Sequence, residues 1–360
     1  MRLRGYIPIA GPARREAADG SEPPVRPVLG MEPRWFHVRC GVDFSERWHA
    51  NPDYRADTLG RMLAELRRAF PGAVQWHGPD ERHTWTIGGC YGVGVIPRLF
   101  GMGMQYHPDR WPVLLPGPTI EAIPEPSRLL DSPLAVEIVE QVETMAARGI
   151  PVTGDLNWQG VLNVAFHVRG QDIFLDMAER PEWAEAFFAA IAETIIQLAR
   201  RVQRRQRESG FDIDYMCVSN CTVNMVSPRM YARMLRPQDE RIALAFGRFG
   251  VHTCNWDVTP YLGALAQLPK VGYLDMGLDS DLRAARAHFP DARLAVLYSP
   301  WKLQAAATEE IEADIARVAR ELAPCDVIAA DITWDTADHR VNEFLELCRR
   351  ASECYLEKQS

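Results

Sequence analysis

A histidine and a cysteine two positions apart are the sharpest chemical signal in this sequence. They are His252 and Cys254, at the end of the short apolar run GVHTCN over residues 250–255. Alternate residues of a strand point to the same side, so both side chains would project from one strand end. An imidazole and a thiolate are ligands that Zn²⁺ prefers in proteins. The pair therefore predicts a metal site, and a buried histidine beside a buried cysteine is the alternative interpretation.

The sequence offers several donors for a third metal ligand. Asp331, at the end of the apolar run DVIAADI, is the favoured candidate because it stands on the same side as His252 and Cys254. Cys217 and Cys221 flank the end of the run IDYMCVS and are less favoured. Cys325 is also less favoured, since it precedes its run and would lie at the opposite end of the strand.

Other polar and aromatic residues follow predicted strands, which is where a barrel enzyme builds its active site. Arg39 is a candidate catalytic residue that could hold a substrate carboxylate or phosphate, and Asp155 is the second catalytic candidate. The candidate substrate-binding residues are His77, Asn157, Trp158, Asn220, Asn224 and Trp334. For each of them, ordinary packing or an exposed loop is the alternative interpretation.

Strand-like and helix-like segments alternate after residue 32. Most strand-like runs are almost continuously apolar, as in parallel strands buried on both faces. Predicted strands span 34–40, 73–78, 151–156, 213–219, 250–255, 271–277, 293–299 and 326–332. Predicted helices span 53–70, 134–148, 182–207, 228–247, 258–268, 279–288, 308–322 and 338–356. Eight such units are what a (β/α)8 TIM barrel requires, and no GxGxxG loop supports an open, doubly wound sheet instead.

The domain organisation follows from these elements. Residues 1–32 are predicted to be an irregular lead-in, and 33–360 to form a single barrel domain. Residues 79–133, after the second predicted strand, are rich in Gly, Pro and aromatic residues. We expect this insertion to lie near the active-site face as a pocket wall or lid, because loops of that kind carry function. A loop that only packs over the end of the barrel is the alternative interpretation.

The composition excludes several classes of protein. The 360 residues are 47% hydrophobic and 24% charged, as in a globular α/β protein and unlike a disordered or coiled-coil chain. A net charge of −8 argues against a nucleic-acid-binding surface, and the arginines of 200–207 are interpreted as a solvated helix face. No apolar run suits a membrane span or a secretory signal. We therefore expect a cytoplasmic protein with reduced cysteines.

Four stretches of the chain are similar to one known family. They are PRWFHVRCG, the region beginning PVTGDLNWQG, the Ser-Pro helix NMVSPRMYARMLRPQDERI, and VHTCNWDVTPYLGALAQL with its His-x-Cys pair. From about residue 33 to the end, the chain resembles the uroporphyrinogen decarboxylase superfamily. It looks closer to the cobalamin-dependent (corrinoid) methyltransferase branch than to the decarboxylases. The resemblance implies the same (β/α)8 barrel.

The resemblance also implies a chemistry. In the methyltransferase branch, His-x-Cys and a distant cysteine bind zinc, which activates a thiol as methyl acceptor. It implies that a methyl group moves between a corrinoid carrier, held by a separate protein, and a small-molecule substrate or a thiol or folate acceptor. It also allows a homodimer. The chain departs from the family at Ala330, where the distant cysteine would fall, and at Val42, where the decarboxylases have a second arginine. A cofactor-free decarboxylase that uses Arg39 is one alternative. A non-catalytic barrel that binds a corrinoid, a tetrapyrrole or a partner protein is the other.

Overall fold

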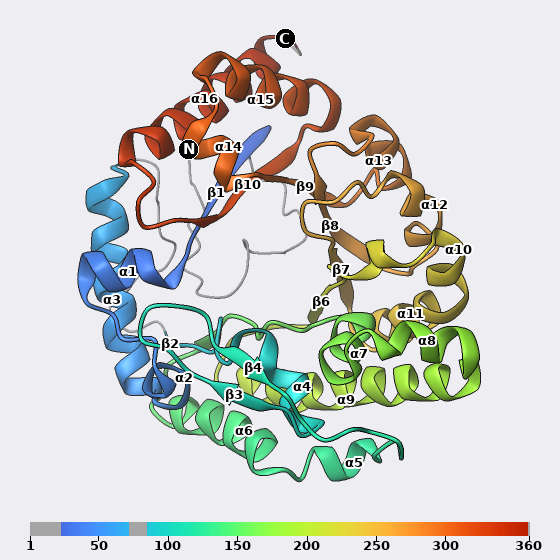
Figure 1. Cartoon of the computed structure of the whole chain (residues 1–360). Coiled ribbons are helices and arrows are strands. Elements are labelled where there is room, and N and C mark those ends of the chain that lie inside the picture. Colours follow the sequence, from blue (N-terminus) through green and yellow to red (C-terminus); the bar gives the residue numbers. More distant parts are fainter. Residues whose placement is uncertain (1–22, 72–84, 359–360) are drawn as a thin grey trace.

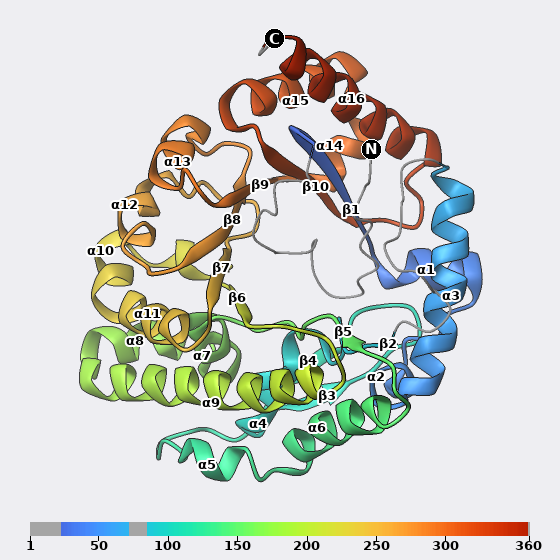
Figure 2. The ribbon, with the colours of Figure 1, turned by 180° about the vertical axis from the view of Figure 1, so that it is seen from behind.

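Parallel strands form the centre of the molecule, and most helices lie around them (Figures 1 and 2). The computed structural model describes residues 23–71 and 85–358. Six strands make one parallel sheet in the order β1-β10-β9-β8-β7-β6. Their bounds are Val25–Met31 (β1), Tyr215–Ser219 (β6), Arg248–His252 (β7), Val271–Gly277 (β8), Arg293–Tyr298 (β9) and Cys325–Ile332 (β10).

Two further parallel strands extend this arrangement. β2 (Trp85–Thr86) pairs with β5 (Val152–Thr153). The chain after β5 then joins β6, because Gln159 bridges Ser219 in parallel and the Ser219 amide donates to the Trp158 carbonyl at 2.8 Å. Pairing thus runs from β2 through β5 and β6 to β1, and the described residues contain no ladder between β1 and β2.

The first predicted strand is wrong. Residues 34–40 belong to helix α1 (Pro33–Cys40), with Pro33 in its first turn and Gly41 closing it at φ +63°. Proline at a helix start and a left-handed glycine just past its end are the common boundaries of a helix. The first strand is instead β1, so residues 25–31 of the predicted irregular lead-in are part of the sheet.

Most other predicted strands are confirmed with small shifts in their bounds. β8 has the predicted bounds, whereas β5 is only two residues long. The prediction over 73–78 lies outside the described residues. Strand β2 falls inside the predicted insertion, which otherwise contains helices and the antiparallel pair β3 (Gly103–Gln105) and β4 (Val113–Leu115).

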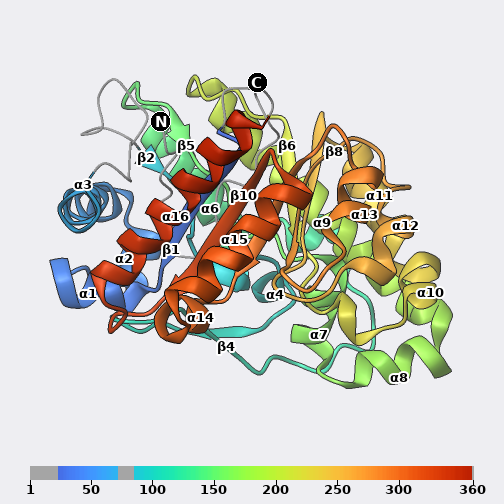
Figure 3. The ribbon, with the colours of Figure 1, turned by 90° about the horizontal axis from the view of Figure 1, so that it is seen from above.

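The helices flank the strands along most of the chain, and Figure 3 shows α15 and α16 lying beside β10. The predicted helix over 228–247 is divided by a π-helical turn over Tyr231–Leu235. The remaining helices are α2 (Glu46–Ala50), α3 (Pro52–Ala69), α4 (Val95–Leu99), α5 (Pro126–Leu129), α6 (Pro133–Ala146), α7 (Val161–Arg169), α8 (Asp172–Glu179), α9 (Pro181–Glu208), α10 (Pro228–Met230), α11 (Arg236–Leu244), α12 (Leu262–Leu265), α13 (Leu282–His288), α14 (Pro300–Ala305), α15 (Thr308–Leu322) and α16 (Asp338–Glu357).

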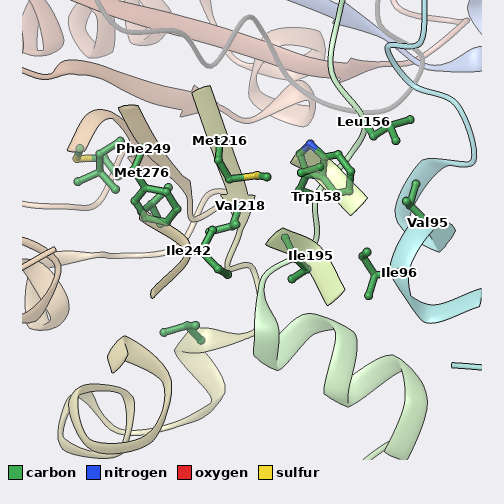
Figure 4. Packing of buried hydrophobic residues seen from close by; sticks show 14 of the residues in the cluster. Val95, Ile96, Leu156, Trp158, Ile195, Met216, Val218, Ile242, Phe249 and Met276 are labelled. Atoms are coloured by element: carbon green, nitrogen blue, oxygen red, sulfur yellow. The ribbon is translucent and has the colours of Figure 1, made fainter. Parts of the chain in front are cut away.

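Two sets of buried side chains hold the strands in place. The larger set lies between the strands and the helices, where Figure 4 shows Met216 of β6 reaching towards Trp158. The smaller set comes from five strands and contains Val28, Cys217, Tyr273, Ala295 and Ile328. Gly250 lies next to this small cluster, and a Cβ there would come within 2.1 Å of the Tyr215 hydroxyl. A larger residue at position 250 would therefore displace the tyrosine.

No helix within the described residues is long and apolar enough to cross a membrane.

Candidate metal centre

The ends of two neighbouring strands bring the site together. Ser219 at the end of β6 is paired with His252 at the end of β7. The Asn220 amide then donates to the His252 carbonyl at 2.7 Å, which extends the pairing by one residue. Cys221 and Cys254 each follow two residues after these paired strand ends, and this register sets the two thiols side by side.

The turn after β7 is left-handed. Cys254 has φ +60°, so the chain leaves the strand after His252 and does not continue the alternation that the sequence predicts. A non-glycine residue in this region is strained and is held there by its surroundings. Gly277 at the end of β8 is part of those surroundings, because a Cβ at Gly277 would lie 2.0 Å from the Asn255 carbonyl oxygen. Glycine at position 277 therefore lets the turn that carries Cys254 pack directly on β8.

Three donor atoms converge at this place. The Cys254 Sγ lies 2.9 Å from the Cys221 Sγ and 3.1 Å from the His252 Nε2. All three ligand atoms lie within 4.8 Å of one another. Neither cysteine forms a disulfide, both are half-buried, and His252 is buried.

A carboxylate behind His252 orients its ring. The Nδ1 of His252 lies 2.6 Å from Oδ2 of Asp275, a fully buried residue of β8. A carboxylate accepts only, so Nδ1 carries the proton and Nε2 presents its lone pair to the thiols. Asp275 also accepts from the Thr253 amide at 2.8 Å and from the Tyr273 hydroxyl at 3.1 Å. These hydrogen bonds fix the direction of the imidazole.

A second buried carboxylate holds the loop that carries Cys221. Asp239 of α11 accepts from the Asn220 side-chain amide at 2.8 Å and from the Tyr231 hydroxyl at 2.9 Å. Tyr231 begins the π-helical turn, a feature that often marks functional regions. Burial raises the pKa of Asp239 to about 6, although both hydrogen bonds favour its ionised form.

The donor set fits a borderline-soft metal ion. Two thiols and one imidazole are typical of zinc sites, and three protein ligands leave one position for a substrate. The hydrogen bond between His252 and Asp275 is the outer-shell contact that metal-bound histidines usually make. The described residues therefore supply a Cys221–His252–Cys254 group that could hold a metal ion.

Asp331, the favoured third ligand from the sequence, is not a member of this group. It lies at the C-terminal end of β10 with φ +53° and is exposed to solvent. Surrounding protein atoms nevertheless raise the pKa of its carboxyl group, and the charge of His252 opposes that rise. Asp331 is thus a neighbour of the group, in electrostatic range of His252. The third member of the group is Cys221.

The two other candidate cysteines stay outside the group. Cys217 points into the small interior cluster beside Tyr273. Cys325 is fully buried at the N-terminal end of β10, where burial raises the pKa of its thiol to about 12. The prediction that Cys325 lies at the opposite end of its strand from the metal group is confirmed.

Arg39 does not present a free charge to a ligand. It lies on α1, where it donates to both carboxylate oxygens of Asp338 at 2.5 and 2.9 Å. It also forms an ion pair with Glu65 at 3.7 Å and covers the ring of Trp35. These contacts make Arg39 a link between α1, α3 and α16.

The residues after β5 are bound to one another. Trp158 is fully buried and donates to Oδ1 of Asp155 at 2.5 Å, so it is a core residue and not a wall of the pocket. Asn157 accepts from the Gln159 side chain at 2.9 Å and from the Ser219 hydroxyl at 3.2 Å. The structure therefore places Asp155 and Asn157 in the polar junction between β5 and β6.

The remaining candidates are dispersed. Asn220 is buried and positions the loop of Cys221, whereas Asn224 is exposed. Trp334 is partly exposed after β10, with the guanidinium of Arg34 over its ring. His77 lies outside the described residues.

Three residues near the metal group had no predicted part in metal binding. Asp275 and Tyr273 stand two apart in the run VGYLDMG, and this alternation on β8 was the available signal. Burial lowers the pKa of His167 on α7, and the charge of Cys221 opposes that lowering, so the two side chains lie close together. No local spacing connects His167 with Cys221.

Comparisons with known proteins identify the fold. No family model and no curated protein matches the chain significantly. Its structure is similar to that of a methyltransferase from Methanosarcina mazei, with a TM-score of 0.63 and 15% identity over 93% of this chain and 95% of that one. A B12-independent methionine synthase from a Shewanella species gives 0.47 and 12% over 88% and 96%. At such identities the first similarity establishes a shared fold, and the second is too weak to add to it.

Proposed function

We propose that this chain is a methyltransferase whose Cys221, His252 and Cys254 hold zinc and whose methyl acceptor is a small thiol. The observation that carries the proposal is the convergence of these three donors at the C-terminal ends of two neighbouring parallel strands. Active sites of barrel enzymes lie at this end of the strands. The fold shared with the Methanosarcina methyltransferase supports the same interpretation.

The proposed chemistry divides between the metal and the chain. Zinc bound here would keep an acceptor thiol ionised at neutral pH, where a free thiol is mostly protonated. Asp275 accepts a hydrogen bond from the Nδ1–H group of His252 and so keeps Nε2 available as a ligand. Asp331 is exposed nearby and has no hydrogen-bond or ion-pair partner among the described residues, so its carboxylate can accept the proton that the thiol releases.

We further propose that the methyl donor is a methylated corrinoid presented by a separate protein. The first test uses purified protein with methylcobalamin and a panel of small thiols, and follows the absorbance change when cobalamin loses its methyl group. A methyl folate serves as the competing donor. Turnover with the folate and none with methylcobalamin would refute the corrinoid as methyl donor. It would leave the proposed metal centre unaffected.

Metal analysis tests the centre itself. We expect about one zinc per chain, with zinc and turnover lost together in Cys221→Ala, His252→Ala and Cys254→Ala. Cys354→Ala is the matched control, because Cys354 is an exposed free thiol on the last helix. Full turnover in zinc-free protein would refute the proposal.

The contacts of Arg39 argue against the decarboxylase alternative. It depends on Arg39 to hold a substrate carboxylate, yet the guanidinium of Arg39 is already engaged by Asp338 and Glu65. Activity that survives chelation and disappears in Arg39→Ala would restore that alternative.

A further inference from the structure

A groove at the opposite end of the strands carries a concentration of arginine. It has a volume of about 520 Å³ and lies between the C-terminal half of α9 and the segments that lead into β6 and β7. Arg200, Arg201, Arg204 and Arg207 line it, together with Asp212 and Asp214. The volume is that of a small-molecule site. Because strands β6 and β7 begin here and the metal group follows their ends, this groove is separate from the metal centre.

Three of the four groove arginines are oriented by backbone carbonyls, and no ion pair with Asp212 or Asp214 is formed by any of the four. Arg200 donates to the Ala245 carbonyl at 3.0 Å, Arg201 to that of Leu130 at 3.0 Å, and Arg207 to that of Ile213 at 2.6 Å. Within the described part of the chain, Arg204 has no hydrogen-bond or ion-pair partner. None of the four forms an ion pair with a described carboxylate.

Arg205 on the same helix shows the contrast. It forms ion pairs with Glu143 at 2.6 Å and Glu208 at 2.7 Å. The groove thus brings together four guanidinium groups and two carboxylates, an excess of positive charge in a chain whose net charge is −8. Guanidinium groups held in a concave site are the usual means of binding phosphate.

We propose that this groove binds a small phosphate-bearing anion. Four guanidiniums supply the attraction, and the carbonyl contacts of Arg200, Arg201 and Arg207 reduce the entropy lost on binding. The carboxylates of Asp212 and Asp214 repel the anion and limit its affinity for the groove. The inference does not rest on the proposed methyl transfer.

Calorimetric titration of the full chain with inorganic pyrophosphate tests this site. We expect binding that weakens as salt is added and falls at least about ten-fold in the double variant Arg200→Gln, Arg204→Gln. Arg205→Gln is the matched control and should leave the affinity unchanged. Asp212→Asn should raise the affinity about three-fold, since it removes a repelling charge.

Two results would overturn the proposal. One is the absence of pyrophosphate binding at millimolar concentration, and the other is an equal loss of affinity in Arg205→Gln and the double variant. Zinc content measured on the same samples should be unchanged in every variant. Loss of zinc from the metal centre would therefore be recognised as a separate effect.

Discussion

The two ends of the parallel strands bury charged residues in opposite ways. At the N-terminal end, Asp326 accepts from Arg26 at 2.7 and 2.8 Å and from Arg293 at 3.0 Å, and all three residues are buried. At the C-terminal end, Asp275 holds His252, whose other nitrogen lies close to the Sγ atoms of Cys254 and Cys221. The first network is closed, because its charged groups bind one another. We call the second network open, because it ends at atoms that can bind a metal ion. Buried charge by itself is therefore no sign of a functional site. The sign in this molecule is a group of metal-ligand atoms that converge on one place.

Removing the carboxylate at the closed end should have the largest effect. Asp326→Ala leaves two guanidiniums buried without their counter-charge, and we expect a loss of about 3–5 kcal/mol in the free energy of unfolding. Urea denaturation measures it. Glu346→Ala is the control, because it breaks an exposed ion pair with Arg349 and should change stability by less than about 1 kcal/mol. Similar losses in the two variants would remove the distinction between the networks.

The pKa of Asp326 is consistent with this role. Burial alone would raise it, but the charges of Arg293 and Arg26 bring the pKa below its usual range. The closed network thus favours the ionised carboxylate in spite of its burial.

Asp239 shows that the C-terminal end also contains a carboxylate with a structural role. Its pKa of about 6, against 3.8 as the ordinary value, means that the folded protein binds the proton more tightly than the unfolded chain. Ionisation of Asp239 therefore costs stability as the pH rises from about 4 to about 6, by roughly 3 kcal/mol. The difference in unfolding free energy between wild type and Asp239→Asn, measured by urea titration across this range, should fall by that amount. A difference independent of pH would contradict the raised pKa.

The sequence predicted the strands better than it predicted the site. β8 and β10 were recognisable because burial on both faces demands a continuous apolar run. The run at 34–40 has a similar composition, and only its flanking Pro33 and Gly41 indicated a helix. Local spacing can identify such boundaries when both caps are considered together.

The site depended on contacts that local spacing does not record. Cys221 and Cys254 occupy equivalent places after β6 and β7, but their proximity depends on the register between the strands and on the left-handed turn at Cys254. Arg39 was predicted to be catalytic because it ended a predicted strand and could hold an anionic group. Its actual partner, Asp338, is 299 positions away in the sequence, so local spacing could not reveal it. A charged residue at a strand end or helix end has no evident role until its partner is known.

Asp275→Asn tests whether the open network serves the metal. The amide presents one accepting oxygen in place of a carboxylate, so His252 loses its charged hydrogen-bond partner. We expect zinc affinity, measured by competition with a chromogenic chelator, to fall about 10- to 100-fold. Asp326→Ala, tested where it is still folded, should keep its zinc affinity. If both variants lost zinc equally, the effect of Asp275 would be one of general stability.

Tyr273→Phe should produce the smallest effect and define how far the open network extends. The hydroxyl of Tyr273 donates to Asp275 Oδ2, the same oxygen that accepts from His252, and its ring packs in the interior cluster. Phenylalanine keeps the packing and removes one hydrogen bond, so the ring of His252 should be held less firmly. We expect zinc affinity to fall about three-fold, with the spectrum of a cobalt-substituted sample altered in the same direction as in Asp275→Asn. An unchanged cobalt spectrum would show that the network ends at Asp275, and that Tyr273 belongs with the packed interior of the strands.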